Sequence, residues 1–412
     1  MTECQKMNFL RDHLPSRVIK AGVFLYLFSL SLPLYSTVPL FFLSLCGILS
    51  ALLTSSAQMS LRSPIIASVL LFIASVVLSA FVSINADRTL LLSLSFFPGL
   101  LIFFLIIENF NIQIIWKSYT AFCVISFAIS FQALWTAVIS ESTDPSVWIR
   151  EMRIPCLLVP NDLVILTLFI PFLISIALRN LHHAASGFAL LTIGLNICVL
   201  TIFQSRGGLI LSIIAIVLTC CLFKSRRLLA IPFLCLLIVL LSDYLWGFAL
   251  FGKLKNVWYS RAPAWAAAWE MFTDSPWLGT GPRSFGHLYF SYQQKTALPA
   301  WLIVDKRIMP WAHNLYLETL AEQGVPGILS FGILIKFMIS DSVAMIRSRN
   351  RDIRFIAVGL FSSLVTFLMA GMFELSFIRH WVVIVFFTMA ALIATAGLKT
   401  HGQQSWQDFH KN

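Results

Sequence analysis

Long apolar runs, separated by short polar segments, recur along almost the whole chain. Most of the runs are about 17 to 25 residues long, which is enough for a helix to cross roughly 30 Å of hydrocarbon. The pattern therefore predicts an all-α polytopic membrane protein with about twelve membrane-spanning helices. The predicted spans cover approximately residues 18–32, 36–53, 64–82, 90–107, 114–139, 162–178, 184–203, 209–223, 228–248, 327–346, 353–373 and 377–398.

The longest polar interval, residues 249–312, is predicted to be a large loop on one side of the membrane. It carries charged side chains and five prolines, so it is not a single span. We therefore divide the chain into three parts. Residues 1–248 hold the first nine spans, 249–312 form the loop, and 313–412 hold a surface helix, the last three spans and a short tail.

Composition agrees with the membrane class. Of the 412 residues, 58% are hydrophobic and 11% are charged, whereas soluble proteins carry about 25% charged residues. The net charge of +11 in such a protein mostly marks cytoplasmic loops rather than a nucleic-acid surface. The eight cysteines form no Cys-x-x-Cys pair, so neither a disulfide framework nor a zinc site is predicted.

The distribution of Lys and Arg predicts the orientation. These residues concentrate in alternate loops and in both terminal segments, which places both termini in the cytoplasm. The basic N-terminal arm shows no small-residue cleavage site, so its apolar run is predicted to stay as an uncleaved span. The opposite side then holds the loop 140–161, Arg206, the interval 249–312 and Arg379. No energy-rich nucleotide is available there, so a glycosyl transfer would need a lipid-linked donor.

The segment Pro310–Ile328, PWAHNLYLETLAEQGVPGI, is the most distinctive stretch. His313 and Asn314 stand in tandem, and nine residues separate Asn314 from a Gly-x-x-Gly at 324–327. Histidine is the commonest general acid or base in proteins. The residues alone leave two interpretations of His313 open, a catalytic group and a residue that only caps or packs a helix.

The same segment predicts a helix with a break. A short surface helix is expected over about 311–323, with His313 and Gly324 on one face and Glu318 off that face. Pro326 lacks an N–H and clashes with the preceding turn, so a membrane helix is expected to start afresh at about Gly327.

Arg206 lies in a Ser-Arg-Gly-Gly sequence between two apolar spans. An arginine at a membrane edge is costly and is usually paired or functional. Its planar guanidinium group can donate paired hydrogen bonds to phosphate oxygens. The glycines after it allow a bulky head group to approach the backbone. The alternative is that Arg206 has no role in binding and only extends its charged group to the membrane–water interface.

Arg261 begins a second candidate anion site. Pro263 is expected in a first helical turn, which places Arg261, Trp265, Ala268 and Phe272 on one face of an amphipathic helix. An arginine at a helix N-terminus beside aromatic residues suits an anion. The alternative is a surface helix with a solvated arginine.

Three weaker candidates lie on the same predicted side. Arg153 precedes Asn161, which is expected to be the N-cap of the next span. Arg379 lies at the start of the last span, either as part of the site or as an interfacial anchor. Residues 279–283, Gly-Thr-Gly-Pro-Arg, fit no nucleotide-binding motif and predict a tight turn.

No metal site is predicted. The chain contains no Asp-x-Asp, and His182 and His183 are adjacent rather than three or four residues apart, which makes them a poor metal pair. Two or three arginines could instead balance the charge of a diphosphate leaving group.

Four stretches resemble the O-antigen ligase and polymerase superfamily, membrane enzymes of GT-C-like architecture that move glycans off a polyprenyl diphosphate. The His-Asn-x9-Gly-x-x-Gly pattern is the most specific of them. The span count and the large loop before the histidine are also similar. The stretches are 201–209 around Arg206, 260–281 around Arg261, 311–327 around His313, and the region of Arg379.

The resemblance implies an O-antigen ligase in the bacterial inner membrane with a periplasmic active site. The donor would be an O-antigen glycan on undecaprenyl diphosphate and the acceptor the lipid A-core. Arg206 and Arg261 would bind the diphosphate, and His313 would bind or deprotonate the acceptor hydroxyl in an inverting reaction. No cofactor, metal or nucleic acid is implied, and the remaining partners are membrane lipids. Possible supporting residues are Asn314, Arg153 and Arg379.

Three other functions remain open. An O-antigen polymerase extends the same lipid-linked repeats and shares the histidine motif. A protein O-oligosaccharyltransferase of the superfamily is disfavoured, because only about fifteen residues follow the last predicted span. A transporter or flippase suits twelve spans, but its polar features should lie near the bilayer midplane in repeated halves, whereas here they gather at one face.

Overall fold

The structure is a computed structural model of the 412-residue chain. It describes residues 3–32, 37–53, 63–83, 85–155, 157–179, 184–223, 254–296 and 309–409, together with the single positions 237, 240 and 244. Two subjects of the sequence analysis lie wholly or almost wholly outside these residues, namely the span expected at 228–248 and the His182–His183 pair.

The described part of the chain is helical and contains no strand. The α-helices are α1 (Glu3–Phe28), α2 (Thr37–Leu53), α3 (Pro64–Val82), α4 (Ala86–Ser93), α5 (Phe97–Asn109), α6 (Ile112–Ile139), α7 (Pro145–Glu151), α8 (Ile165–Arg179), α9 (Ala184–Ile202), α10 (Arg206–Leu222), α12 (Leu254–Asp274), α13 (Phe285–Gln293), α14 (Leu315–Ile346), α15 (Arg351–Gly371) and α16 (His380–Phe409). Short 3₁₀ turns cover Ser29–Ser31, Leu94–Phe96 and Pro160–Val164.

Eight helical segments of the described residues are long and apolar enough to cross a membrane. Two shorter apolar helices, Pro39–Ile48 and Arg206–Leu222, accompany them. The all-helical, multi-pass membrane class is therefore confirmed, whereas the count of about twelve spans stays a prediction. The eight segments are Pro64–Val82, Ala86–Asn109, Ile112–Ile139, Pro160–Arg179, Ala184–Ile202, Leu315–Ile346, Arg351–Gly371 and His380–Leu398.

Helix α16 forms the centre of the bundle, where it packs against α5, α14 and α15. Its membrane-spanning part is 94% buried inside the protein, because apolar residues cover every face and small ones such as Ala390 and Ala394 admit close neighbours. The hydroxyl of Tyr26 on α1 lies 2.8 Å from Nε2 of His380, so the first helix is tied to the start of the last.

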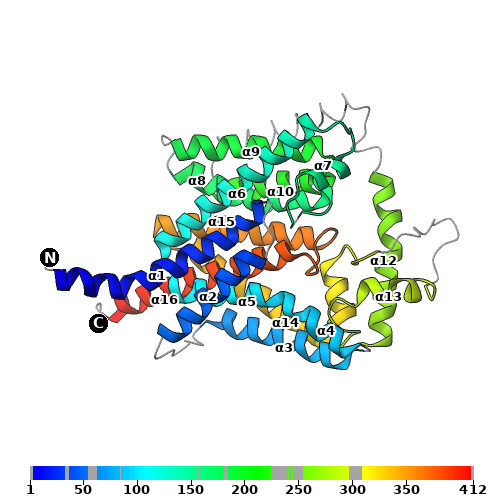
Figure 1. The fold of residues 1–412 in the computed structure, drawn as a ribbon, viewed down its shortest axis with the longest axis horizontal. Coiled ribbons are helices and arrows are strands. Elements are labelled where there is room, and N and C mark those ends of the chain that lie inside the picture. The colour runs from blue at the N-terminus through cyan, green and yellow to red at the C-terminus, as the bar shows by residue number, and fades with distance from the viewer. Residues whose placement is uncertain are drawn as a thin grey trace.

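The polar loops gather at one end of the bundle (Figure 1). Helices α7, α12 and α13 lie there, while both chain ends lie at the opposite end. The interval 254–296 carries the helices α12 and α13, and the helix predicted around Arg261 is part of α12, but Pro263 lies inside α12 rather than in its first turn. The prediction failed because residues 254–260 are also helical.

Helix α14 differs from the prediction at its start. It begins at Leu315, since the side chain of Asn314 accepts hydrogen bonds from the N–H groups of Tyr316 and Leu317, each at 3.0 Å, and so caps it. His313 precedes the helix with φ 52°, so the expected helical face shared with Gly324 is wrong.

The expected break in α14 is confirmed at Gly324, which has φ 64° and ψ −159°. Only glycine adopts this region readily. A methyl group there would lie 2.5 Å from the carbonyl oxygen of Trp277 and 2.6 Å from that of Pro276. Glycine at this position thus lets residues 276–277 pack directly on the helix.

Candidate active site

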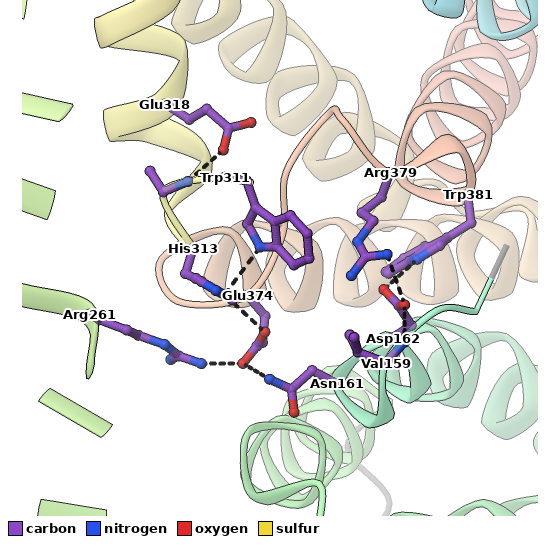
Figure 2. Close-up of polar contacts among 11 residues, drawn as sticks. Val159, Asn161, Asp162, Arg261, Trp311, His313, Glu318, Glu374, Arg379 and Trp381 are labelled. Carbon is purple, nitrogen blue, oxygen red and sulfur yellow. Dashed lines mark hydrogen bonds and ion pairs between the residues drawn. The ribbon is translucent and has the colours of Figure 1, made fainter. Parts of the chain in front are cut away.

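Glu374 lies at the centre of a polar cluster at the loop end of the bundle (Figure 2). It belongs to the segment between α15 and α16, and its side chain is only 9% exposed. Its Oε1 accepts a hydrogen bond from Nδ2 of Asn161 at 2.9 Å and pairs with the guanidinium of Arg261. Its Oε2 lies 3.7 Å from Nδ1 of His313. Three side chains that are far apart in the sequence therefore meet at one carboxylate.

The ring of His313 has a donor and an acceptor beside the same nitrogen. The indole N–H of Trp311 donates to Nδ1 at 3.1 Å, and the carboxylate of Glu374 lies beyond hydrogen-bond distance on the same side (Figure 2). Because indole is only a donor, Nδ1 is an acceptor in this arrangement. The proton of the neutral ring is then on Nε2.

Arg379 forms a second, more deeply buried group next to the first. Its guanidinium lies 3.3 Å from Oδ2 of Asp162 and 4.0 Å from the ring centre of Trp311. Oδ1 of Asp162 accepts a hydrogen bond from the indole of Trp381 at 3.1 Å. Burial lowers the pKa of Arg379, and the carboxylates of Asp162 and Glu374 oppose that shift. Arg379 is thus a buried ion-pair residue and not an interfacial anchor.

Trp311 joins the two groups. Its N–H contacts His313, and the face of its ring covers Arg379. Such stacking of a cation on an aromatic ring contributes about 0.5–2 kcal/mol. The position of His313 therefore depends on the ion pair behind Trp311.

Asn161 and Asp162, at the start of the next span, both make contacts with residues outside it. Asn161 was predicted to cap the next span, but its amide donates to Glu374. The carboxylate of Asp162 instead accepts from the backbone N–H groups of Leu158 and Val159, at 2.7 and 3.0 Å. A carboxylate accepts more strongly than an amide from these N–H groups.

Two further carboxylates, Glu318 and Glu322, lie one helical turn apart on α14 and are buried. Glu318 accepts from the backbone N–H of Ala312 at 3.0 Å and from the hydroxyl of Ser376. Ala312 precedes His313, and Ser376 follows Glu374 by two residues, so Glu318 joins the two segments that carry the site. Glu318 was predicted to lie off the helical face that His313 and Gly324 were expected to share, so its part in the site was missed. The sequence did hold a signal for Glu318, because an acidic side chain in a largely apolar membrane helix is usually functional or paired.

Glu322 holds the glycine-rich turn at residues 279–283. Its carboxylate accepts from the backbone N–H groups of Arg283 and Phe285 at 2.8 and 3.0 Å. The backbone of Gly279, at φ 67°, lies so close to Glu322 that any side chain there would overlap it. Burial lowers the pKa of Arg283, and the two acidic side chains oppose that shift. The predicted turn is confirmed, and it is docked on α14.

The remaining predicted residues lie at different distances from the cluster. Arg206 is the first residue of α10, and a methyl group on Gly207 would lie 3.9 Å from Cγ of Glu374, so this helix end adjoins the cluster. Arg153 is exposed in the segment after α7, with φ 52°. Among the described residues, no hydrogen bond or ion pair joins its side chain to Glu374.

The described residues contain no group of three or more His, Cys, Asp or Glu side chains placed to bind a metal ion. The charged groups of the cluster are instead the guanidinium groups of Arg261 and Arg379 and the carboxylates of Glu374 and Asp162. Such an arrangement can bind an anion such as a phosphate, because each guanidinium offers five N–H donors and its carboxylate uses only some of them.

A comparison with known protein families gives a match over about a third of the chain. Residues 188–332 match the family model described as O-Antigen ligase. The matched segment contains Arg206, Arg261 and His313, and it confirms the resemblance to this family. A comparison with curated proteins finds no match. The family indicates a ligase or polymerase type of activity in a multi-pass membrane protein.

Proposed function

We propose that this chain, which carries the O-antigen ligase family segment, transfers an O-antigen glycan from undecaprenyl diphosphate to the lipid A-core. The observation that carries the proposal is the meeting of Arg261 and His313 at Glu374, with the start of α10 beside them. These are the groups that such a transfer needs, namely cations for the departing diphosphate and an imidazole for the acceptor hydroxyl.

In the proposed reaction the acceptor oxygen forms a bond to the anomeric carbon while the bond from that carbon to the diphosphate oxygen breaks. Arg206 and Arg261 stabilise the negative charge that develops on the diphosphate. The electron pair leaves with the diphosphate, and the anomeric configuration inverts because the attack is a single displacement. The hydroxyl proton passes to His313.

In the proposed reaction, Glu374 allows His313 to act as the base by stabilising the required tautomer of its ring. To accept a proton at Nε2, the imidazole must carry its other proton on Nδ1, and a carboxylate is the group that stabilises that form. Glu374 lies on the Nδ1 side at 3.7 Å. A small rotation of the ring from Trp311 towards Glu374, together with the transfer of the ring proton from Nε2 to Nδ1 through solvent, would leave Nε2 able to accept the hydroxyl proton.

The arrangement of the bundle supports the proposed location in the bacterial inner membrane. The cluster and the two chain ends lie at opposite ends of the molecule (Figure 1). If both termini are cytoplasmic, as the distribution of Lys and Arg predicts, the cluster faces the periplasm. Lipid-linked glycans and the lipid A-core would meet it there.

The test is His313→Ala in a host deleted for the gene, with His287→Ala as the matched control, because His287 is exposed on α13. We expect His313→Ala to give rough lipopolysaccharide on a gel, with undecaprenyl-linked polymer accumulating on an immunoblot. His287→Ala should restore the ladder. A normal ladder with His313→Ala, at equal amounts of folded protein, would contradict the assignment.

The same gel separates the ligase from the polymerase, which the family match leaves open. In the deletion host a core bearing a single repeat would indicate a polymerase. Core without any repeat, together with carrier-bound polymer, would indicate the ligase. An unchanged ladder would exclude both functions for that glycan.

A further inference from the structure

A cavity of about 600 Å³ lies at the far end of the bundle from the Glu374 cluster. It is formed where α8, α10 and α14 end and where α15 begins. Its lining includes Arg351 and Arg354 together with the apolar residues Leu178, Phe223 and Phe355. A cavity with cations on one wall and apolar groups on another is suited to an amphipathic anion.

The two arginines add uncompensated positive charge to this cavity. They lie three residues apart on α15, so their side chains leave the same face of the helix. The neighbouring acid, Asp352, pairs instead with Nε of Arg179 at 3.2 Å. Within the described part of the chain, neither Arg351 nor Arg354 forms an ion pair with a carboxylate.

Contacts between aromatic rings hold the apolar wall of the cavity in place. The rings of Phe223 and Phe355 have centroids 4.6 Å apart, and the guanidinium of Arg351 lies 5.3 Å from the centre of the Phe355 ring. A phosphate on the two guanidinium groups would place the adjoining glycerol and acyl carbons over these rings. Guanidinium groups match phosphate oxygens in geometry and charge.

We propose that this cavity binds the headgroup of an anionic phospholipid from the membrane leaflet at this end of the bundle. Basic pockets between the ends of membrane helices bind such headgroups. The lipid would join α10, α14 and α15, of which the first two start beside the Glu374 cluster. The proposal stands independently of the transferase activity, because none of its residues belongs to that cluster.

The experiment compares lipid retention by native mass spectrometry of the purified full-length protein. The probes are phosphatidylglycerol and phosphatidylcholine with the same acyl chains. The pocket variant is R351Q/R354Q, and the matched control is R347Q/R349Q, which removes the same charge from two exposed arginines of the preceding loop. At about 1 kcal/mol for each basic side chain, the pocket variant should bind phosphatidylglycerol about 30-fold more weakly.

We expect the control variant to retain phosphatidylglycerol within about twofold of the wild type. If both variants lost phosphatidylglycerol binding equally, the proposal would be overturned, because the loss would then reflect the total positive charge of this end of the bundle and not the cavity. Equal retention of both lipids by the wild type would overturn it as well, and this comparison holds even if R351Q/R354Q does not fold. Displacement of phosphatidylglycerol by millimolar inorganic phosphate, with no preference for the lipid, would indicate a site for a small anion and also overturn it.

Discussion

Glu374 and Glu322 lie at the same end of the bundle and are both largely buried, but they hold different kinds of groups. Glu374 accepts from side chains, those of Asn161 and Arg261, and lies near His313. Glu322 accepts from backbone N–H groups of the glycine-rich turn. Side chains can exchange a carboxylate for a substrate, whereas backbone groups cannot leave theirs without unfolding the turn. The comparison separates a cluster arranged for binding from one that fixes the chain.

The strongest test of this difference is Glu322→Ala. It leaves two buried N–H groups, those of Arg283 and Phe285, without their acceptor, at a cost of about 1–3 kcal/mol each. We expect a loss of about 2–6 kcal/mol in the free energy of unfolding, measured by thermal unfolding in detergent. Glu322→Gln keeps one carbonyl acceptor and should lose less. An Ala variant as stable as the wild type would mean that the turn does not depend on Glu322.

Glu374→Gln should show the opposite behaviour. The amide keeps the size and one acceptor, so the unfolding free energy should fall by only about 1 kcal/mol. The lost charge removes the anionic partner of Arg261 and the carboxylate that, in the proposed reaction, stabilises a proton on Nδ1 of His313. We expect the rate of transfer from an undecaprenyl-linked donor to fall about 30-fold, equivalent to about 2 kcal/mol.

The control for Glu374→Gln is Asn161→Ala, which removes only the neutral donor to the same carboxylate. A neutral hydrogen bond contributes about 1 kcal/mol, so its rate should fall only about fivefold. If Glu374→Gln unfolds the protein as severely as Glu322→Ala does, the two carboxylates do not differ in role.

A smaller effect is expected from Gly324→Ala, which changes the break beside Glu322. Its backbone conformation is open almost only to glycine, and the methyl group would strike two carbonyl oxygens, so we expect a loss of about 1–3 kcal/mol in unfolding free energy. The matched control is Gly332→Ala in the same helix, where nothing lies within 4 Å of the added carbon. That variant should be stabilised by about 0.5–1 kcal/mol. Equal melting temperatures for the two would contradict the requirement for glycine at 324.

Local patterns predicted the features that depend on neighbouring residues. Apolar run lengths gave the membrane class, and Gly324 with Pro326 gave the break in α14. The start of that helix was predicted too early, at about Trp311, because the apolar residues before Asn314 suit a helix. The side chain of Asn314 caps the helix and so fixes its start at Leu315. The error at Pro263 was of the opposite kind, because α12 begins at Leu254, well before the proline.

Glu374 could not be predicted because its importance comes from contacts across the fold. It is a single acid in a short segment between two spans, 113 residues from Arg261 and 213 from Asn161. No periodicity or motif marks it, whereas His313 is marked by its motif. Glu318 and Glu322 were visible as acids in an apolar helix, but their partners across the fold, the hydroxyl of Ser376 and the backbone N–H groups of the glycine-rich turn, were not.

The enclosure of α16 has a consequence for how the protein is made. This helix is synthesised after the three helices α5, α14 and α15 that it contacts on different sides, yet its span is 94% buried. Until it inserts, those helices have no partner along their inner faces. The bundle can therefore close only after α16 has been synthesised, when this helix enters between helices already in the bilayer and His380 reaches Tyr26 of α1. During that interval the nascent bundle would be a target for the chaperones and proteases that survey the membrane.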